Sequence, residues 1–248
     1  MRVDVFFGPP SAVPAEAPHR VVVVIDVLRA STTIAVALAN GARTVIPLES
    51  SDAVVTRAKA FERADVRMAG ERKMRPIPGF DLGNSPREFT RDAVAGKTVL
   101  MTTSNGTHAI AVSQGARDVI VGSYVNFSAV STVLRAALRG NTDIAIVCAG
   151  REHQFALEDA GCAGRYVYHV TKRIANVDTN DAAQACVLLD RKYADNVLRL
   201  FDASEHGRAL RAAGFGDDLI ACAEIDSYPI IPVYQDRQIT KLGPDRER

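Results

Sequence analysis

The 248-residue sequence has few cysteines, no long apolar run and almost no net charge. Its four cysteines, at positions 148, 162, 186 and 222, include no Cys-x-x-Cys pair, which argues against a disulfide scaffold or a zinc site and favours a reducing compartment. The longest aliphatic run covers only residues 21–25, whereas a membrane helix needs roughly 18 apolar residues. No signal peptide is visible, and 30 basic against 29 acidic residues give no support to a general polyanion binder. We therefore expect a soluble, cytoplasmic protein that binds neither membranes nor nucleic acid.

The apolar residues, 47% of the chain, form short β-branched segments that alternate with Ala- and Leu-rich segments. Near-continuous aliphatic strands separated by single helices are typical of a mainly parallel sheet covered on both faces. The predicted strands are 3–7, 21–25, 44–48, 66–69, 98–102, 118–121 and 143–148, and the predicted helices are 31–40, 51–63, 106–114 and 126–139. Longer helices follow residue 152, including one over 157–172, and one or two strands end the chain. We predict an α/β fold in three layers, α/β/α, as a single domain over residues 1–248.

An internal repeat extends this prediction. Residues 33–46 align with residues 107–120 at an offset of 74, and eight of these fourteen positions are identical. Chance similarity between two Ala-rich helices is the alternative explanation. A true repeat predicts a duplicated β-α-β-α-β unit over 21–72 and 97–152, with the loops 26–32 and 103–106 at equivalent positions, each before a helix.

Polar residues gather where the predicted strands end, which is where open parallel sheets bind ligands. Asp26 directly follows a buried strand and is a candidate metal ligand, base or nucleophile. Arg29 offers a bidentate fork for an oxyanion, and Ser31 and Thr32 add hydroxyls at a helix start that favours phosphate. The alternative is an ion pair between Asp26 and Arg29, with Ser31 as a plain helix cap.

A second polar loop, which contains Thr103, Asn105, Gly106 and Thr107, also enters a helix. It lacks the lysine of a Walker A loop, so it is not a nucleotide-binding P-loop. The loop is either an anion cradle without lysine or an ordinary turn with threonine capping. The repeat favours the cradle, because oxyanion donors would then occupy the same loop position twice.

The irregular segment 78–86 carries Asp81, Asn84 and Ser85. Its prolines and glycines fix the backbone, while these three residues supply ligating oxygens. The segment is therefore either a structural Ω-loop or a lid that places a carboxylate over the site.

Further charged groups lie near the same predicted edge. Glu71 follows a strand, and Glu158 and Asp159 begin the 157–172 helix, where paired acids ordinarily complement the helix dipole. The cations Arg72, Lys73, Arg75 and Arg151 are candidates for binding a second anion, with solvated surface charge as the alternative. The five histidines form no promising metal set, and we expect His206 at the surface.

Several blocks together resemble the 2-phosphosulfolactate phosphatase family over about residues 1–240. The blocks are Asp26-Val-Leu-Arg29-Ala-Ser31-Thr32-Thr33, Gly79-Phe-Asp81-Leu-Gly-Asn84-Ser85-Pro86, residues 102–107, Cys148-Ala-Gly150 and Leu157-Glu158-Asp159. The resemblance implies a magnesium-dependent hydrolase with an α/β fold. Such an enzyme removes phosphate from (2R)-2-phospho-3-sulfolactate on the route to coenzyme M.

Combining the residues with the resemblance assigns each candidate a role. The catalytic candidates are Asp26, Arg29 and Asp81, and the Mg²⁺ ligands are drawn from Asp26, Glu71, Glu158 and Asp159. Substrate contacts are assigned to Ser31, Thr32, Asn84, Ser85, Thr103, Asn105, Gly106, Thr107 and Arg151. The expected partner is a small phosphorylated acid, and a homo-oligomer is compatible with the sequence.

Two other classes of function remain open. A non-catalytic binding protein or sensor for phosphorylated acids would keep Arg29 and the threonine loops without any magnesium-dependent turnover. A structural subunit would need none of the polar edge, so clustering of Asp26, Asp81 and Asn105 in space would count against it.

Overall fold

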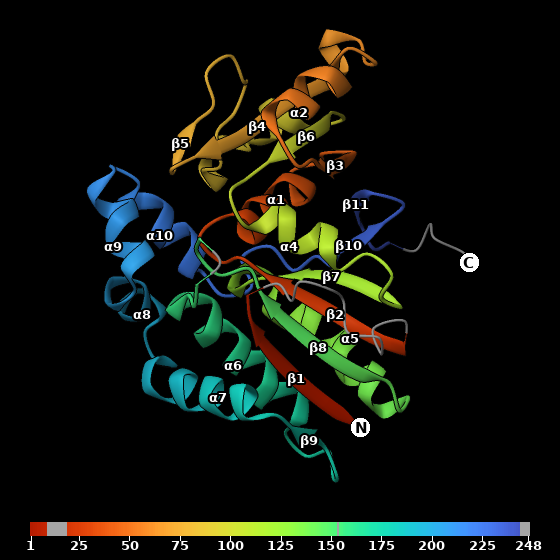
Figure 1. Ribbon diagram of the computed structural model, residues 1–248, viewed down its shortest axis with the longest axis vertical. Coiled ribbons are helices and arrows are strands. Elements are labelled where there is room, and N and C mark those ends of the chain that lie inside the picture. The colour runs from red at the N-terminus through yellow and green to blue at the C-terminus, as the bar shows by residue number, and fades with distance from the viewer. Residues whose placement is uncertain (9–18, 153, 244–248) are drawn as a thin grey trace.

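The computed structural model describes residues 1–8, 19–152 and 154–243, which form one large sheet with helices on both faces (Figure 1). The strands are β1 (Arg2–Phe7), β2 (Arg20–Ile25), β3 (Thr44–Pro47), β4 (Val66–Arg72), β5 (Arg75–Pro76), β6 (Thr98–Thr102), β7 (Asp118–Gly122), β8 (Asp143–Cys148), β9 (Asp178–Thr179), β10 (Pro232–Gln235) and β11 (Gln238–Lys241). The helices are α1 (Ala30–Ala39), α2 (Ser51–Ala58), α3 (Arg91–Val94), α4 (Gly106–Val112), α5 (Phe127–Arg139), α6 (Leu157–Thr171), α7 (Asp181–Tyr193), α8 (Val197–Ala203), α9 (Glu205–Ala212) and α10 (Gly216–Ala223). All seven predicted strands are present, and the predicted helix 51–63 ends earlier, at Ala58.

The strand β2 shows why the fold has three layers. Its residues are all buried, and successive side chains point to opposite faces of the sheet. Val21 and Val23 pack in one core with α5 and α6, while Val22 and Val24 pack in a second core with α1 and α4. The three-layer α/β/α prediction is therefore confirmed.

The two predicted units have the same order of elements, β2-α1-β3-α2-β4 and β6-α4-β7-α5-β8. The first strand of each unit lies between two strands of the other unit. β6, from the second unit, lies between β4 and β3, and β2, from the first unit, lies between β7 and β8. The strand registers correspond as well. Val21 of β2 lies opposite Asp118 of β7 and Ile144 of β8, and Thr98 of β6 lies in the same way opposite Thr44 of β3 and Val66 of β4. These correspondences support the predicted duplication.

The glycines after the first helix of each unit also correspond. Gly41 follows α1 with φ +94°, and Gly115 follows α4 with φ +101°. A left-handed backbone conformation at the end of a helix strongly favours glycine. The shared Gly-Ala-Arg segment therefore ends two equivalent helices.

The C-terminal strands β10 and β11 form an antiparallel hairpin in the middle of the sheet, between β7 and β3 (Figure 1). Three successive antiparallel pairings would place the carboxyl ends of β2 and β6 at opposite edges of a flat sheet. Neighbouring strands rotate by roughly 20–25°, so the five steps from β6 to β2 accumulate a twist of about 100°. This twist lets the loops after β2 and β6 meet on the side covered by α1 and α4.

The helices after residue 152 pack closely on one another, and the glycines of α6 allow this close approach. A Cβ at Gly164 would lie 1.9 Å from the carbonyl oxygen of Cys186 in α7, and one at Gly161 would lie 2.4 Å from Leu200 in α8. The glycines of α6 thus face other helices, whereas Ala160 and Ala163 belong to the core beneath the sheet. No helix in the described residues is long and apolar enough to cross a membrane.

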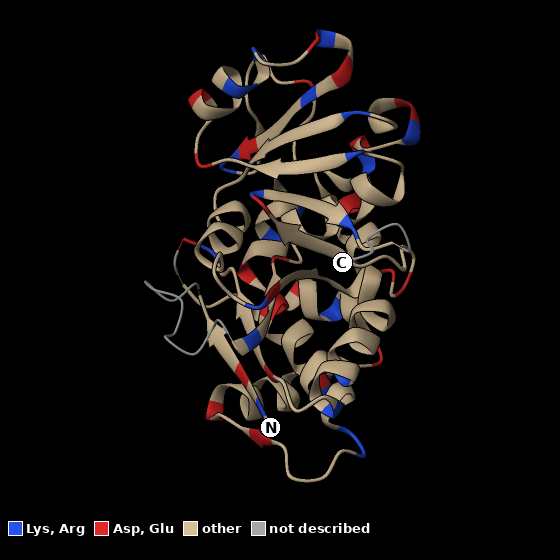
Figure 2. Cartoon of the chain, turned by 90° about the vertical axis from the view of Figure 1, so that its right-hand side faces the viewer, with Lys and Arg blue, Asp and Glu red and all other residues tan. Residues whose placement is uncertain are grey.

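Charged residues of both signs are distributed along the whole ribbon in Figure 2. Lysine and arginine, in blue, are interspersed along the ribbon with aspartate and glutamate, in red. The prediction that the protein does not bind nucleic acid stays a prediction.

Candidate active site

A cavity of about 290 Å³ lies where the loops after β2, β4, β6 and β8 meet. Of the candidate residues, Asp26, Arg29, Glu71, Asn84, Thr103, Asn105 and Arg151 line it. Residues from four separate loops therefore come together at one place, as expected for a ligand site at the ends of strands.

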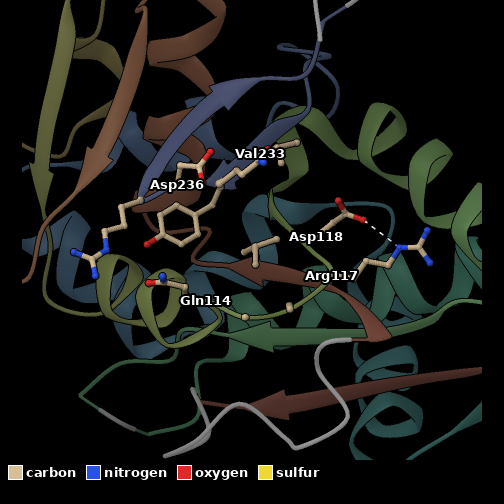
Figure 3. Close-up of a pocket in the computed structure, with 11 residues that line it drawn as sticks. Gln114, Arg117, Asp118, Val233 and Asp236 are labelled. Atoms are coloured by element: carbon tan, nitrogen blue, oxygen red, sulfur yellow. Dashed lines mark ion pairs between the residues drawn. The ribbon is translucent and has the colours of Figure 1, made fainter. Parts of the chain in front are cut away.

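A larger cavity, of about 660 Å³, lies beside the β10–β11 hairpin (Figure 3). Its polar lining includes Gln114, Asp236 and an exposed pair, Arg117 and Asp118, whose charged atoms are 3.8 Å apart. It contains no buried charged side chain and none of the predicted site residues. We therefore take the smaller cavity as the candidate active site.

Asp26 lies at the start of α1 and against the start of α4. Its backbone N–H donates to Oγ of Ser31 at 2.8 Å, and its Oδ1 accepts from the N–H of Ala30 at 3.2 Å. A Cβ at Gly106 would lie only 2.6 Å from Oδ2 of Asp26, so the contact requires glycine. Ser31 thus fixes the loop and does not line the cavity, which differs from its predicted role in substrate contact.

The environment of Asp26 disfavours its ionised form. The pKa of Asp26 is raised to about 6, mainly by burial and to a lesser extent by the charges of Glu71 and Glu158, while His206 and the Ala30 N–H act in the opposite direction. Perturbed carboxylates in a cleft are typical of functional sites. A cation or a positively charged substrate group would stabilise the ionised carboxylate.

Arg29 is held rigidly beside Asp26 by residues from distant segments. Its Nη1 donates to Asp218 of α10 at 2.6 Å, its Nη2 donates to the carbonyl of Met74 at 2.9 Å, and its guanidinium lies 4.3 Å from the ring centre of Phe215. Ser85 donates to the other oxygen of Asp218 at 2.6 Å. The partner of Arg29 is therefore Asp218 rather than Asp26, and the hydroxyl of Ser85 supports that pair.

Asn84 has an unusual polar atom. The residue is 5% exposed and lines the cavity, and its Oδ1 has no hydrogen-bond partner among the described residues. An unsatisfied buried acceptor costs free energy unless a ligand, an ion or water supplies a partner. A ligand or ion that reached Asn84 from the cavity would supply the missing partner.

Most polar groups of the second loop already form hydrogen bonds, either within the loop or to neighbouring loops. Thr103 and Thr107 each accept the other's N–H, at 3.2 and 3.1 Å, and Oδ1 of Asn105 accepts the N–H of Glu152 at 3.1 Å. Gly106 and Thr107 do not line the cavity. The loop therefore has the hydrogen bonds of a capped turn, and Thr103 and Asn105 are its candidates for substrate contact.

Thr32 likewise lies behind the cavity. Its hydroxyl donates to the carbonyl of Val27 at 2.9 Å and is 2.7 Å from Oγ of Ser123. It does not line the cavity, so the structure gives it a supporting position.

The other predicted metal ligands also have protein partners, and for Glu71 and Asp159 these engage both carboxylate oxygens. Both oxygens of Glu71 accept backbone N–H groups, from Met74 and Ser104, each at 2.8 Å. Both oxygens of Asp159 also accept backbone N–H groups, from Val27 at 2.9 Å and Gly150 at 3.1 Å. No three His, Cys, Asp or Glu side chains within 1–8, 19–152 and 154–243 form a group that could hold a metal.

The charges of Glu158, Asp26 and Asp159 nonetheless interact. Burial raises the pKa of Asp159 well above its usual value, and the charges of Asp26 and Glu158 raise it further. Glu158 does not line the main cavity but lines an adjacent one of about 350 Å³, which shares Arg151 and His206 with it.

Asp81 lies away from this cluster. Its carboxylate pairs with Arg63 and accepts the N–H of Met68 at 2.8 Å, and it does not line the cavity. Although burial acts in the opposite direction, these hydrogen bonds hold the pKa of Asp81 below its usual value. The structure corrects the expectation that Asp81 faces the cleft; the 78–86 segment contributes Asn84 to it instead.

Sequence reasoning missed residues that reach the site from far along the chain. His206, expected at the surface, lines both cavities, and its Nδ1 lies 3.2 Å from Oε1 of Glu158. Asp218 and Phe215 hold Arg29 from α10 and the loop before it. No local pattern marks these residues, because their partners lie more than forty residues earlier in the chain.

Taken together, the sheet and the convergent loops define an α/β enzyme whose cavity is lined by both a buried carboxylate, Asp26, and a fixed arginine, Arg29. The model of the family described as 2-phosphosulpholactate phosphatase matches residues 8–237. The chain therefore belongs to the 2-phosphosulfolactate phosphatase family, a family of phosphoric monoester hydrolases.

Relatives support this membership over nearly the whole chain. A protein of Symbiobacterium thermophilum is 41% identical over 92% of this chain and 96% of its own length. A second relative, from Caldanaerobacter subterraneus subsp. tengcongensis, is 38% identical over 85% and 86%, and one from Pseudothermotoga lettingae is 35% identical over 98% and 100%. Each of the three is named a probable 2-phosphosulfolactate phosphatase.

Proposed function

We propose that the protein hydrolyses the phosphate monoester of a small acid, specifically (2R)-2-phospho-3-sulfolactate to 3-sulfolactate and phosphate, with Mg²⁺ as cofactor. The observation that carries this proposal is the position of Asp26, which is buried beside a fixed arginine in a cavity formed by the family's motif loops. Phosphoryl transfer to water depends mainly on positioning and charge neutralisation, which such a site can supply.

Arg29 is the group best placed to bind the phosphate. Its contacts to Asp218, Met74 and Phe215 fix the guanidinium, and the residue lines the cavity. A fixed guanidinium stabilises the oxygens of a transferring phosphoryl group without reorganising during the reaction. Because Glu158 contacts Nδ1 of His206, the other ring nitrogen, Nε2, would be the one to hydrogen-bond the same substrate.

The donor set at the cavity fits magnesium. Mg²⁺ prefers oxygen ligands and is ordinarily bound by one or two carboxylates, several waters and substrate phosphates. Asp26 and the unpartnered Oδ1 of Asn84 would hold the ion, and Glu71 lines the same cavity. When bound, the ion would neutralise phosphate charge and help to position water.

We also infer that the reaction takes place in the cytoplasm, on the route to coenzyme M. Four free cysteines, all buried in the described structure, are compatible with a reducing compartment. The route itself follows only from the family's activity.

The test measures phosphate release from (2R)-2-phospho-3-sulfolactate with Mg²⁺ and with a chelator. We expect turnover that the chelator abolishes, and a loss of about 10²–10³-fold in Asp26→Asn, which retains the shape of the side chain but not its charge. Asp81→Asn serves as the matched acid outside the cavity and should change the rate by less than about threefold. Tight substrate binding without turnover would favour the alternative, a sensor for phosphorylated acids, and activity unaffected by the chelator would refute the magnesium assignment.

A further inference from the structure

The basic side chains that line the cavity differ in whether an acid neutralises them. Arg29 pairs with Asp218, Arg151 pairs with Glu205, and His206 contacts Glu158. Lys73 also lines the cavity, but no acidic side chain among residues 1–8, 19–152 and 154–243 pairs with it. The cavity therefore has one basic group whose charge remains available to a ligand.

The neighbouring cations Arg72 and Arg75 are not placed to offer their charge to a ligand in the cavity. Arg72 donates to the backbone carbonyl of Glu71 and to Oγ1 of Thr102, at 2.7 and 3.0 Å, and does not line the cavity. Arg75 is exposed and also lies outside the cavity lining. Of the four cations that the sequence offers for a second anion, the structure thus favours Lys73.

The backbone that carries Lys73 is tightly constrained. Lys73 and Met74 form the two-residue turn between β4 and β5, with φ +50° and +69°. A two-residue hairpin with both φ values positive ordinarily contains asparagine and glycine, because other residues are strained there. Such strain persists only where surrounding contacts over-determine the conformation.

Two site residues provide those contacts. The carbonyl of Met74 accepts from Arg29 at 2.9 Å, and the N–H of Met74 donates to Glu71 at 2.8 Å. The other oxygen of Glu71 accepts the N–H of Ser104, so it joins this turn to the loop after β6. The position of Lys73 is therefore coupled directly to the residues that would bind the phosphate.

We propose that Lys73 is a specificity-determining residue that binds a second anionic group, a sulfonate or a carboxylate, on the phosphate ester. This inference rests on the proposed function for the identity of the ester. The cavity lining also contains the acids Asp26, Glu71 and Glu152, which would repel a polyanion. An unpaired ammonium group at its edge offsets that repulsion for the correct substrate and gives no advantage to an ester without a second anion.

The test compares Lys73→Met with the wild-type protein on three esters: 2-phosphosulfolactate, 2-phospholactate and phenyl phosphate. Besides the phosphate, 2-phosphosulfolactate carries a sulfonate and a carboxylate, and 2-phospholactate carries a carboxylate. Phenyl phosphate carries no second anion. We expect KM for 2-phosphosulfolactate to rise about three- to fivefold more than KM for phenyl phosphate, as for loss of an exposed ion pair, with kcat little changed. Lys73→Arg should restore most of the difference, and Arg75→Met, on the same hairpin but outside the cavity, should show none.

The effect on 2-phospholactate assigns the anion. If KM for 2-phospholactate rises in Lys73→Met as much as KM for 2-phosphosulfolactate, Lys73 binds the carboxylate. If only KM for 2-phosphosulfolactate rises, Lys73 binds the sulfonate. Equal changes for all three esters, or no change, would overturn the proposal.

Binding of 3-sulfolactate, measured by calorimetry, separates this proposal from the phosphatase assignment, because the compound has no phosphate to lose. Weaker binding in Lys73→Met than in wild type supports the anion site even if no ester is hydrolysed, in which case only the proposed function fails. Equal affinity of the two proteins for 3-sulfolactate would refute the role of Lys73 even if the esters are hydrolysed.

Discussion

Asp26 shows at the scale of a single residue how a functional group can oppose stability. The fold buries its carboxylate beside two other acids, so ionisation of Asp26 costs more in the folded than in the unfolded chain. A carboxyl group whose pKa is raised in the folded state stabilises the protein below the unfolded pKa, and this contribution is lost as the pH rises through the folded pKa.

Asp26→Asn should therefore be more stable than wild type at pH 8, without metal. The folded pKa of about 6 against 3.8 corresponds to at most about 3 kcal/mol in the free energy of unfolding. The advantage should shrink between pH 6 and 4 and vanish below it. Urea unfolding in a chelator, across this pH range, measures it.

Asp81→Asn is the control of opposite sign. Because its pKa is lowered in the fold, Asp81 contributes stability above the unfolded pKa that is lost as the pH falls. Its partner Arg63 is largely exposed, so the variant should lose less than about 1 kcal/mol at pH 8. A stability gain in both variants would contradict the assigned pKa shifts.

At the scale of elements, the short helix α10 acts on the site through Arg29. The Arg29–Asp218 pair is almost completely buried, with both side chains 2% exposed. Removing one partner of a buried pair leaves an uncompensated charge and typically costs 3–5 kcal/mol. The C-terminal helices therefore form part of the candidate active site.

Asp218→Asn tests this contribution. We expect the free energy of unfolding to fall by about 3 kcal/mol and inhibition by inorganic phosphate to weaken, because Arg29 loses its ionic support. Asp217→Asn is the matched control, since the adjacent Asp217 is 68% exposed and pairs with the exposed Arg87. If the two variants bind phosphate equally well, α10 does not position Arg29.

The start of α4 makes a second contact at this scale. A Cβ at Gly106 would lie 2.5 Å from Cβ of Ala30 in α1, as well as against Asp26. Gly106→Ala should therefore push the two helix starts apart, lower stability by about 1–3 kcal/mol and reduce the rate of phosphate release at least tenfold.

Gly140→Ala provides the comparison for this substitution. Its φ is −80° and the nearest atoms to an added Cβ lie at 3.4 Å, so the change should be nearly neutral for both thermal stability and turnover. Wild-type turnover in Gly106→Ala would show that the close approach of α1 and α4 is not needed.

At the scale of the whole molecule, the two units are interlocked. β2 of the first unit pairs with β7 and β8 of the second, and β6 of the second unit pairs with β3 and β4 of the first. If one unit unfolds, the other therefore loses the strand that lies between two of its own strands. The β10–β11 hairpin then joins the two groups of strands. We expect a single cooperative unfolding transition, consistent with one domain.

Ile239→Ala in β11 tests the cooperativity. The side chain is fully buried beside Val45, and such truncations cost about 2–5 kcal/mol. Hydrogen exchange should accelerate by the same factor in β6 and β8, which lie on opposite sides of the hairpin. Leu242→Ala, at a side chain that is 42% exposed, should change neither the stability nor the exchange rates. Faster exchange on only one side of the hairpin would mean that the two groups of strands unfold separately.

Local features of the sequence determined the strands, the three-layer class and the duplication. The residues 21–25 predict a buried strand because every side chain is aliphatic, and the repeated Gly-Ala-Arg segment predicts two helix ends because glycine adopts positive φ there. The clustering of Asp26, Arg29, Asn84 and Asn105 also followed from the sequence, since each lies in a loop that leaves a strand or enters a helix.

Only the tertiary structure decided which groups are neighbours within that cluster. Arg29 pairs with Asp218, which is 189 residues away in the sequence, and His206 contacts Glu158, which is 48 residues away. Asp81 pairs with Arg63 outside the cluster. The position of the terminal hairpin within the sheet was equally hidden, because strand order depends on pairing between segments far apart in the chain. Local patterns fix the conformation of a segment, whereas these contacts depend on packing and hydrogen bonding over the whole chain.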